Sequence, residues 1–272
     1  MPTVISDPLR LAFVHIPKCG GSTIGPQLAA QVACDPYFLQ TRWVDHPALG
    51  KLMPSHVPLW AMRDHFPEAF ARLRAYDGFA ICREPRARFL SALSQHAREL
   101  RRIDVSRIDR AGLLGIVDEV IAAFDAGPQA LLHAYIHFVP QSDFVVLEGE
   151  AVVTNLWAIE ALPDLARALS ARSGAAIDGE ERHNKTNFYR SDLVKSSIAR
   201  LKPVAERLLP TRLFRTTRRI VLAAATVPVQ DQLRAVLDAP RVADFIARTY
   251  AADAALHARM RATVARPGSA PP

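Results

Sequence analysis

The hydrophobic pattern of the chain alternates between short apolar runs and longer amphipathic stretches. Residues 11–16 and 79–82 are short runs bounded by turn or charged residues, a pattern typical of strands that are buried on both faces. We expect weaker strands over 144–147 and 156–162. Strands that alternate with helices predict an α/β fold in which helices flank a central parallel sheet.

The amphipathic stretches predict the helices of this fold. Pro85 suits a first helical turn and is expected to open a helix that runs to about residue 102. Residues 35–60 are rich in Pro, His and aromatic side chains and predict loops with short extended pieces. Further helices are expected over 22–34, 66–76, 111–126, 128–138 and 163–172, and in the C-terminal third.

Length and composition favour one α/β domain. The chain has 272 residues, of which 50% are hydrophobic, and this suffices for one sizeable core. We expect a single domain over 1–266 and a disordered tail over 267–272. The first ten residues lack the pattern of a signal peptide, and no apolar run approaches the roughly 20 residues of a membrane span. Three cysteines without metal spacing are expected to be reduced thiols.

The positive charge is concentrated in residues 195–219. Eight Lys and Arg residues and one Glu in this segment give a surplus of +7, which equals the formal net charge of the whole chain. Three interpretations are open: a solvated helical face, a patch for an acidic acceptor or nucleic acid, and an amphipathic surface for anionic lipid. Pro203 and Pro210 interrupt the segment, and four leucines indicate one packed side. We favour a partly packed lid or acceptor-binding element.

The chemistry of the chain is most evident where residues 11–16 run into Lys18, Cys19, Gly20, Gly21, Ser22 and Thr23. A strand that ends in a glycine-rich loop before a helix directs backbone N–H groups and a lysine at one spot, which suits phosphate or a similar anion. In a nucleoside-triphosphate loop of the form GxxxxGK[ST] the lysine follows the glycines. Here Lys18 precedes Gly20 and Gly21, so that interpretation fits poorly.

This order resembles the donor-binding loop of sulfotransferases, which typically reads PK(T)GG(T)S. Residues 79–91, FAICREPRARFLS, are similar to the family's 3′-phosphate motif, with Arg83 and Ser91 at the expected spacing. The chain is most similar in character to carbohydrate sulfotransferases of the heparan-sulfate 2-O and 6-O types and their bacterial relatives. Weaker similarities lie at Pro140-Gln141, Ile159-Glu160, 183–186 and 244–253. The resemblance implies a P-loop-type three-layer fold and, without the family's N-terminal anchor, a cytoplasmic enzyme.

The resemblance also implies the donor and its binding residues. The donor is 3′-phosphoadenylyl sulfate (PAPS), its product is 3′-phosphoadenosine 5′-phosphate (PAP), and no metal is required. Lys18 would stabilise the leaving phosphate, and Arg83 and Ser91 would hold the 3′-phosphate. Cys19, Gly20, Gly21, Ser22 and Thr23 would surround the 5′-phosphosulfate, and Lys185 and Thr186 would lie over the 3′ end. Arg86 and Arg88 are expected to have surface or ion-pair roles. The acceptor would be a hydroxyl of a carbohydrate or glycolipid-like molecule; we expect no nucleic-acid partner.

Two residue types in this resemblance leave alternatives. Cys19 stands where the family usually has Thr; it is either a thiol acidified by the helix N-terminus or, as we favour, a passive small side chain. His56, within Pro-Ser-His-Val-Pro, matches the family's general base, and histidine suits proton transfer near neutral pH. His15, His46 and His65 compete for this role. His133 and His137 are four residues apart, and we favour a helix face over a metal pair.

Two other functions compete with sulfuryl transfer. A P-loop kinase or NTPase would need a magnesium-binding Ser or Thr directly after a loop lysine and an acidic strand end, and neither is evident. A non-catalytic module on the same fold would bind the nucleotide without transfer, and loss of the base would be its mark. The presence of His56 favours the enzyme.

Overall fold

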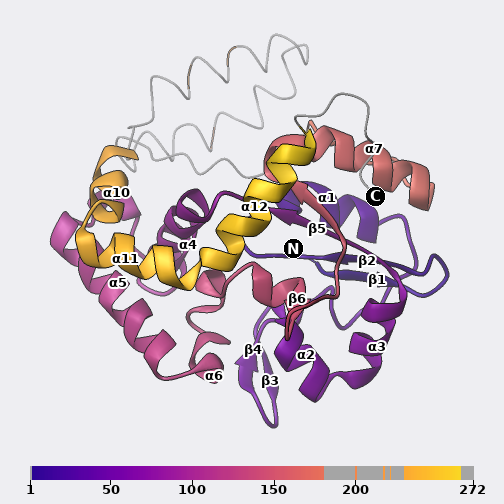
Figure 1. Ribbon diagram of the computed structural model, residues 1–272, viewed down its shortest axis with the longest axis horizontal. Coiled ribbons are helices and arrows are strands. Elements are labelled where there is room, and N and C mark those ends of the chain that lie inside the picture. Colours follow the sequence, from indigo (N-terminus) through magenta and orange to yellow (C-terminus); the bar gives the residue numbers. More distant parts are fainter. Residues whose placement is uncertain (1, 181–199, 201–216, 218–220, 222–229, 265–272) are drawn as a thin grey trace.

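The computed structural model describes residues 2–180, 200, 217, 221 and 230–264 (Figure 1). A four-stranded sheet with the order β1-β2-β5-β8 lies at its centre. Strands β2 (Leu11–Val14), β5 (Asp77–Cys82) and β8 (Asn155–Ala158) are parallel, and β1 (Val4–Ser6) joins β2 in the antiparallel direction. The predicted α/β fold with a mostly parallel sheet flanked by helices is thus confirmed, and β1 is an addition.

The buried strands begin near the expected residues, because their apolar runs fill the core on both sides. In β2 all four residues are buried, and in β5 all except Asp77 are. The strand expected over 156–162 ends at Ala158, because Ile159–Ala161 forms a 3₁₀ helix and α7 (Leu162–Ser173) starts directly after it.

The strand expected over 144–147 is present only at its last two residues and does not join the main sheet. Ser142–Phe144 is a 3₁₀ helix, and β6 (Val146–Leu147) pairs only with β7 (Glu150–Ala151) in a separate hairpin. Glu148 and Gly149 connect these two strands with positive φ angles of 51° and 85°, the conformation of a tight hairpin turn.

Most helices lie close to their predicted ranges. Beside the sheet are α1 (Gly21–Ala29), which is shorter than predicted, α3 (Pro67–Ala75) and α4 (Pro85–Glu99), which Glu84 caps by accepting from two backbone amides. The remainder of the helical part consists of α5 (Arg110–Asp125), α10 (Gln230–Leu237), α11 (Pro240–Thr249) and α12 (Ala251–Val264). Residues 35–60 contain the hairpin of β3 (Val44–His46) and β4 (Gly50–Leu52) and the start of α2 (Leu59–His65).

The prediction of one helix over 128–138 is wrong. Helix α6 (Pro128–Leu131) ends early, and Ile136–Phe138 forms a separate 3₁₀ helix. The backbone at the end of this segment is held by buried side chains from distant parts of the chain: Arg88 donates to the carbonyls of His137 and Val139, and Tyr250 donates to that of Phe138. Tertiary contacts therefore override the local helical pattern, and His133 and His137 do not share a helix.

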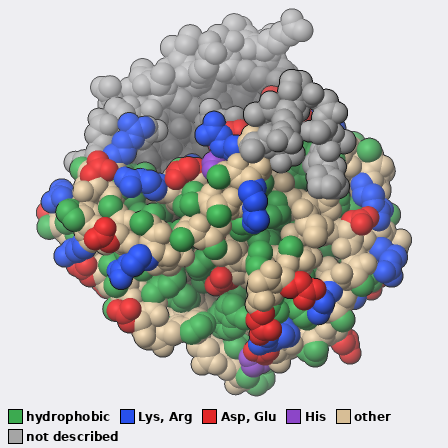
Figure 2. All heavy atoms as spheres, in the orientation of Figure 1, with side chains coloured by type: hydrophobic (Ala, Val, Ile, Leu, Met, Phe, Trp, Pro, Cys, Tyr) green, Lys and Arg blue, Asp and Glu red, His purple; other side chains and the backbone are tan. Residues whose placement is uncertain are grey.

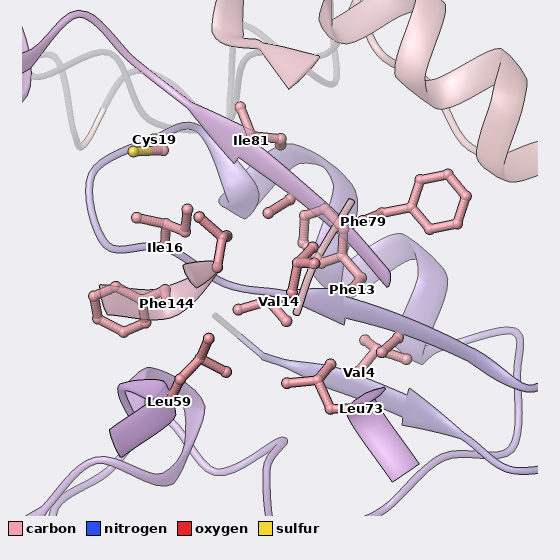
Figure 3. Close-up of a cluster of buried hydrophobic side chains, with 14 of the residues drawn as sticks. Val4, Phe13, Val14, Ile16, Cys19, Leu59, Leu73, Phe79, Ile81 and Phe144 are labelled. Atoms are coloured by element: carbon pink, nitrogen blue, oxygen red, sulfur yellow. The ribbon is translucent and has the colours of Figure 1, made fainter. Parts of the chain in front are cut away.

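Two hydrophobic clusters support the fold. The larger surrounds the sheet and includes Phe13, Phe79 and Phe144, and Figure 3 shows Cys19 at its margin, where the loop after β2 turns. The smaller joins α4, α5, α10 and α11 around Phe89 and Phe138. Figure 1 shows α12 running across the molecule from α11 toward α7.

Surface charges in the described part are interspersed and in several cases paired. On the face shown in Figure 2, basic and acidic side chains alternate with apolar ones. Arg86 pairs with Asp238 at 3.0 Å and Arg241 with Asp118 at 2.9 Å, both from α4 or α5 to the C-terminal helices. Of the basic segment 195–219 only Arg200 and Thr217 belong to the described residues, so its three interpretations stay predictions. The tail 267–272 also lies outside the described residues. None of the described helices has the length and hydropathy needed to cross a bilayer.

Candidate functional site

The loop between β2 and α1 turns sharply, and its two glycines are required for different reasons. Lys18 and Gly20 have positive φ angles of 67° and 85°. A Cβ at Gly20 would lie 2.9 Å from Ile159 Cδ1, and one at Gly21 would lie 2.5 Å from Nδ1 of His15. The N–H of Thr23 donates to the carbonyl of Gly20 at 3.1 Å. Among the described residues no side chain caps α1, so no side chain competes with an anion for the amides of Gly21 and Ser22.

Arg83 meets this loop because β2 and β5 are parallel neighbours whose carboxyl ends lie at the same edge of the sheet. Its Nη1 donates to the carbonyl of Lys18 at 3.4 Å. The side-chain amide of Gln141 holds the backbone of Arg83 by accepting from its N–H at 2.7 Å and donating to its carbonyl at 2.9 Å. The structure thus brings together the two motifs, which are about 65 residues apart in sequence.

A buried carboxylate on α12 anchors this arrangement. Asp253, which is 1% exposed, accepts from the backbone amides of Gln141 and Ser142 at 2.8 Å each. The segment that holds Arg83 is therefore fixed from the C-terminal helix. In the sequence, Gln141 and Asp253 were noted only as parts of weak similarities to sulfotransferases.

Cys19 is buried, and its side chain is directed at Gln141. Its Sγ donates to Oε1 of Gln141 at 3.0 Å, and burial raises the pKa of the thiol to about 12. A helix N-terminus can acidify a thiol only where the thiolate remains solvated or paired. The structure supports the passive small residue over the acidified nucleophile.

Lys18 is half-buried and is held by helix α4. Its Nζ donates to Oε1 of Gln95 at 3.1 Å. Burial, followed by the nearby charge of Arg98, lowers the pKa of Lys18 to about 8. A cation that has lost water in this way gains more from an incoming anion than an exposed lysine does.

The remaining predicted donor residues lie on the two helices that begin at this edge of the sheet. Ser22 is half-buried and Thr23 is buried in the first turn of α1. Ser91 is half-buried on α4, one helical turn before Gln95, and so lies on the same helix face as the partner of Lys18. Lys185 and Thr186 lie outside the described residues.

Three histidines form a buried cluster next to Lys18. The rings of His15 and His56 stack with centroids 4.8 Å apart, and His137 meets His56 edge-on at 5.8 Å. Their exposed fractions are 2%, 5% and 7%. His15 Nδ1 has no hydrogen-bond partner in the structure. Sequence reasoning placed His15 and His56 near this site, but it assigned His137 to a helix face.

Burial keeps all three rings neutral. It lowers the pKa of His56 to about 3, and the charges of the chain's N-terminus and of Lys18 act in the same direction. The pKa values of His15 and His137 also fall well below the ordinary 6.5, first because of burial and then because of His56. His56 Nδ1 lies 2.9 Å from the carbonyl of Ser55, so in the neutral ring Nδ1 carries the hydrogen and Nε2 carries the lone pair.

Of the three histidines that compete with His56, His15 stacks on it, whereas His46 and His65 belong to other contacts. His46 and His65 meet each other at 5.5 Å, and His46 also packs on Phe66. The exposed His133 meets Trp43. Within the described ranges, no group of three or more His, Cys, Asp or Glu side chains is arranged to hold a metal ion.

Helix α4 contributes two residues that sequence reasoning missed. Gln95, which binds Lys18, also donates to Glu99 through its Nε2. Oε2 of Glu99 lies 3.8 Å from Nδ1 of His137. The available signal was their spacing, because Ser91, Gln95 and Glu99 recur every four residues and therefore share a face.

The prediction that Arg88 has a surface or ion-pair role is wrong. Arg88 is 2% exposed, donates to the carbonyls of His137 and Val139, and lies 5.7 Å from the centroid of the Tyr250 ring. It fixes the backbone that carries His137. Arg86, on the opposite side of the same helix, does form the expected surface ion pair, with Asp238.

The chain matches no family model, no curated protein and no solved structure. Its function must therefore be inferred from the residues themselves. They combine an uncapped helix N-terminus, a half-buried lysine, an arginine in contact with the same loop and a neutral buried histidine cluster.

Proposed function

We propose that the protein is a sulfotransferase that moves a sulfuryl group from PAPS to a hydroxyl of a carbohydrate or glycolipid-like acceptor. The observation that carries this proposal is the contact between Arg83 and the backbone of Lys18, at 3.4 Å. PAPS has anionic groups at both ends of its ribose, and two cationic motifs that meet at one sheet edge suit such a molecule. The order of Lys18 and the glycines, unlike that of an NTPase loop, supports the same donor.

The donor end of the site consists of groups that bind anions in different ways. The N-terminal amides of α1 suit the 5′-phosphosulfate because helix N–H groups and the helix dipole favour negative charge. Ser22 can add a hydroxyl, whereas Cys19 is directed at Gln141 and contributes only its backbone. Arg83 suits the 3′-phosphate because its planar fork can form two hydrogen bonds to one phosphate, and Ser91 can add a third.

The reaction needs a base for the acceptor and a cation for the leaving group. The acceptor oxygen forms a bond to sulfur while the bond between sulfur and the 5′-phosphate oxygen breaks, and the electron pair of that bond stays on the phosphate. Lys18 offsets the charge that forms there. The hydroxyl proton passes to Nε2 of His56, which is the unprotonated nitrogen of the ring, and is later released to water.

The low pKa of His56 fits this role once the donor is present. A pKa of about 3 leaves the ring unprotonated and ready at neutral pH, but only weakly basic. Anionic groups bound next to Lys18 favour the protonated ring and move the pKa upward. The donor itself therefore makes His56 a stronger base at the moment of transfer.

A non-catalytic nucleotide-binding module is the second candidate, and the burial of His56 favours it. Only 5% of this residue is exposed, so an acceptor hydroxyl reaches it only if neighbouring side chains move. Such a module would bind PAP as tightly as the enzyme does and transfer nothing.

Two assays in sequence test the proposal. Thermal unfolding with PAP, AMP, ATP and GTP is expected to give a shift selective for PAP. Transfer of labelled sulfuryl groups from PAPS to a panel of glycans and glycolipids, in EDTA, is then expected to give product with wild type and none with His56→Ala, while both bind PAP. Selective stabilisation by ATP or GTP would contradict the donor assignment. PAP binding without transfer to any acceptor would favour the module.

A further inference from the structure

A continuous series of contacts links Lys18 to His56 by way of helix α4. Lys18 Nζ donates to Gln95, Gln95 donates to Glu99, and Glu99 lies 3.8 Å from Nδ1 of His137. His137 then meets His56 edge-on, with ring centroids 5.8 Å apart. The two residues proposed to act on the leaving group and on the acceptor are therefore joined through residues that have no assigned role.

The position of His137 in this series is fixed by its backbone. Arg88 donates to the carbonyl of His137 at 3.0 Å and to that of Val139. The ring is 7% exposed, so little room is left for another rotamer. Glu99, in contrast, has a side chain that is 42% exposed and reaches solvent.

The distance between Glu99 and His137 suits a protonated ring better than a neutral one. At 3.8 Å it is too long for a hydrogen bond to the neutral imidazole. It becomes an ion pair when His137 carries a proton. The pKa of His137 is lowered first by burial and then by the charges of His56, Lys18, Arg88 and His96; the titratable His15 also interacts with it, and all of these groups oppose protonation. Glu99 is thus the nearby carboxylate that can offset them.

We propose, on the premise of the sulfotransferase function, that His137 and Glu99 are positioning residues for His56. His137 packs edge-on against the ring of His56, and the carboxylate of Glu99 acts through His137 to stabilise the positive charge that His56 acquires with the acceptor proton. The proton stays within the histidine cluster until product leaves. Glu99 also raises the pKa of Lys18, to which it is linked by Gln95, and this effect is separate from the one on His137.

The test is the number of protons that the protein takes up when it binds PAP. It is measured by titration calorimetry at pH 7 in buffers with different heats of ionisation. Because a bound anion favours protonated histidines, wild type is expected to take up protons. Glu99→Gln removes the offsetting carboxylate and is expected to reduce the histidine share of the uptake about threefold, as a shift of about half a pH unit implies for rings whose pKa in the complex lies below 7. The matched control Glu119→Gln removes a carboxylate with a similar exposed fraction, 44%, that pairs with Arg101 and is not expected to change the uptake.

The decisive comparison is the effect of Glu99→Gln in a His137→Gln background. If Glu99 acts through His137, Glu99→Gln has a clearly smaller effect on proton uptake and on the acid limb of the pH–rate profile in this background than in wild type, and the part that remains is its separate effect on Lys18. Equal effects of Glu99→Gln in both backgrounds would overturn the proposal, and so would an uptake that Glu99→Gln leaves unchanged. Should His137→Gln fail to fold, the surface variant Glu99→Gln alone still decides, because a proton uptake equal to that of wild type would overturn the proposal. Failure of PAP to bind at all would overturn the sulfotransferase function and this proposal together, whereas binding without this coupling would overturn only the latter.

Discussion

Acidification is expected to destabilise this protein because its histidine cluster is buried in the neutral form. The pKa of His56 lies at about 3 in the folded chain, and those of His15 and His137 lie well below the ordinary 6.5. In the unfolded chain all three regain that ordinary value. The unfolded state therefore binds more protons below pH 6.5, so the stability is complete above that pH and is lost as the pH falls through it.

The size of the effect follows from the change in protonation of the unfolded chain. Between pH 7.5 and 5.5 an unfolded histidine goes from about 9% to about 91% protonated, which costs about 1.4 kcal/mol for each ring that stays neutral in the folded state. Three rings give a loss of about 4 kcal/mol. Asp143 acts in the opposite direction, because burial and then Asp253 raise its pKa to about 6, so that it gains a proton in the folded state. This gain of about 1 kcal/mol leaves a net loss of about 3 kcal/mol.

The assay is urea unfolding of wild type at the two pH values at constant ionic strength. His56→Gln is expected to reduce the pH-dependent difference by about 1.4 kcal/mol, whatever it does to the stability at pH 7.5. His133→Gln, which removes an exposed histidine, serves as the control and is expected to retain the wild-type difference. A wild-type difference below about 1 kcal/mol, or one that His56→Gln leaves unchanged, would refute the neutral cluster.

Three further predictions concern individual residues. Arg88→Met leaves two buried carbonyls without a donor and is expected to lower the free energy of unfolding by about 3 kcal/mol or more. Its control, Arg86→Met on the same helix, breaks a surface ion pair and is expected to cost at most about 1 kcal/mol. Equal losses of the two variants in urea unfolding would contradict the structure. Gly21→Ala drives a Cβ into the ring of His15 and is expected to lower the free energy of unfolding by about 1–3 kcal/mol. Its control, Gly115→Ala, meets nothing within 4 Å and is expected to stabilise helix α5 by about 0.5–1 kcal/mol. An unchanged stability of Gly21→Ala would show that the loop lies elsewhere. Since the pKa of Lys18 is about 8, PAP affinity in calorimetry is expected to fall as the pH rises from 7 to 9, and an affinity that is constant over this range would exclude Lys18 from the site.

The sheet and the meeting of the two motifs could be predicted from sequence because they depend on local patterns. Short apolar runs bounded by turn or charged residues are typical of buried strands, which allowed β2 and β5 to be predicted. That Lys18 and Arg83 act together was implied by the resemblance to sulfotransferases, and the parallel pairing of the two strands is what brings them to one edge. Residues 128–138 were mispredicted because Arg88 and Tyr250 hold the end of this segment, at the carbonyls of residues 137–139, from far away in the sequence. No local pattern contains that information.

The site itself was predictable only where a motif marked it. His15 could be placed near the loop because it lies in the run 11–16 just before it, but nothing in the sequence marks it as a ring stacked on His56. His137 lies in apolar surroundings, and such a pattern does not distinguish a ring beside His56 from a ring on the surface. Glu99 looks like one of many charges on an amphipathic helix. Its place beside His137 depends on the segment after α6 folding back over α4, which is again a tertiary contact.

The most direct measurement of the central claim is the affinity of wild type and Arg83→Gln for PAP and for AMP, which lacks the 3′-phosphate. Wild type is expected to bind PAP at least tenfold more tightly than AMP, because a charge-assisted hydrogen bond contributes about 1.5–3 kcal/mol. Arg83→Gln is expected to lose most of this preference while its affinity for AMP stays the same. A preference for PAP that survives in Arg83→Gln, or no preference in wild type, would contradict a single site formed by Arg83 and the loop of Lys18.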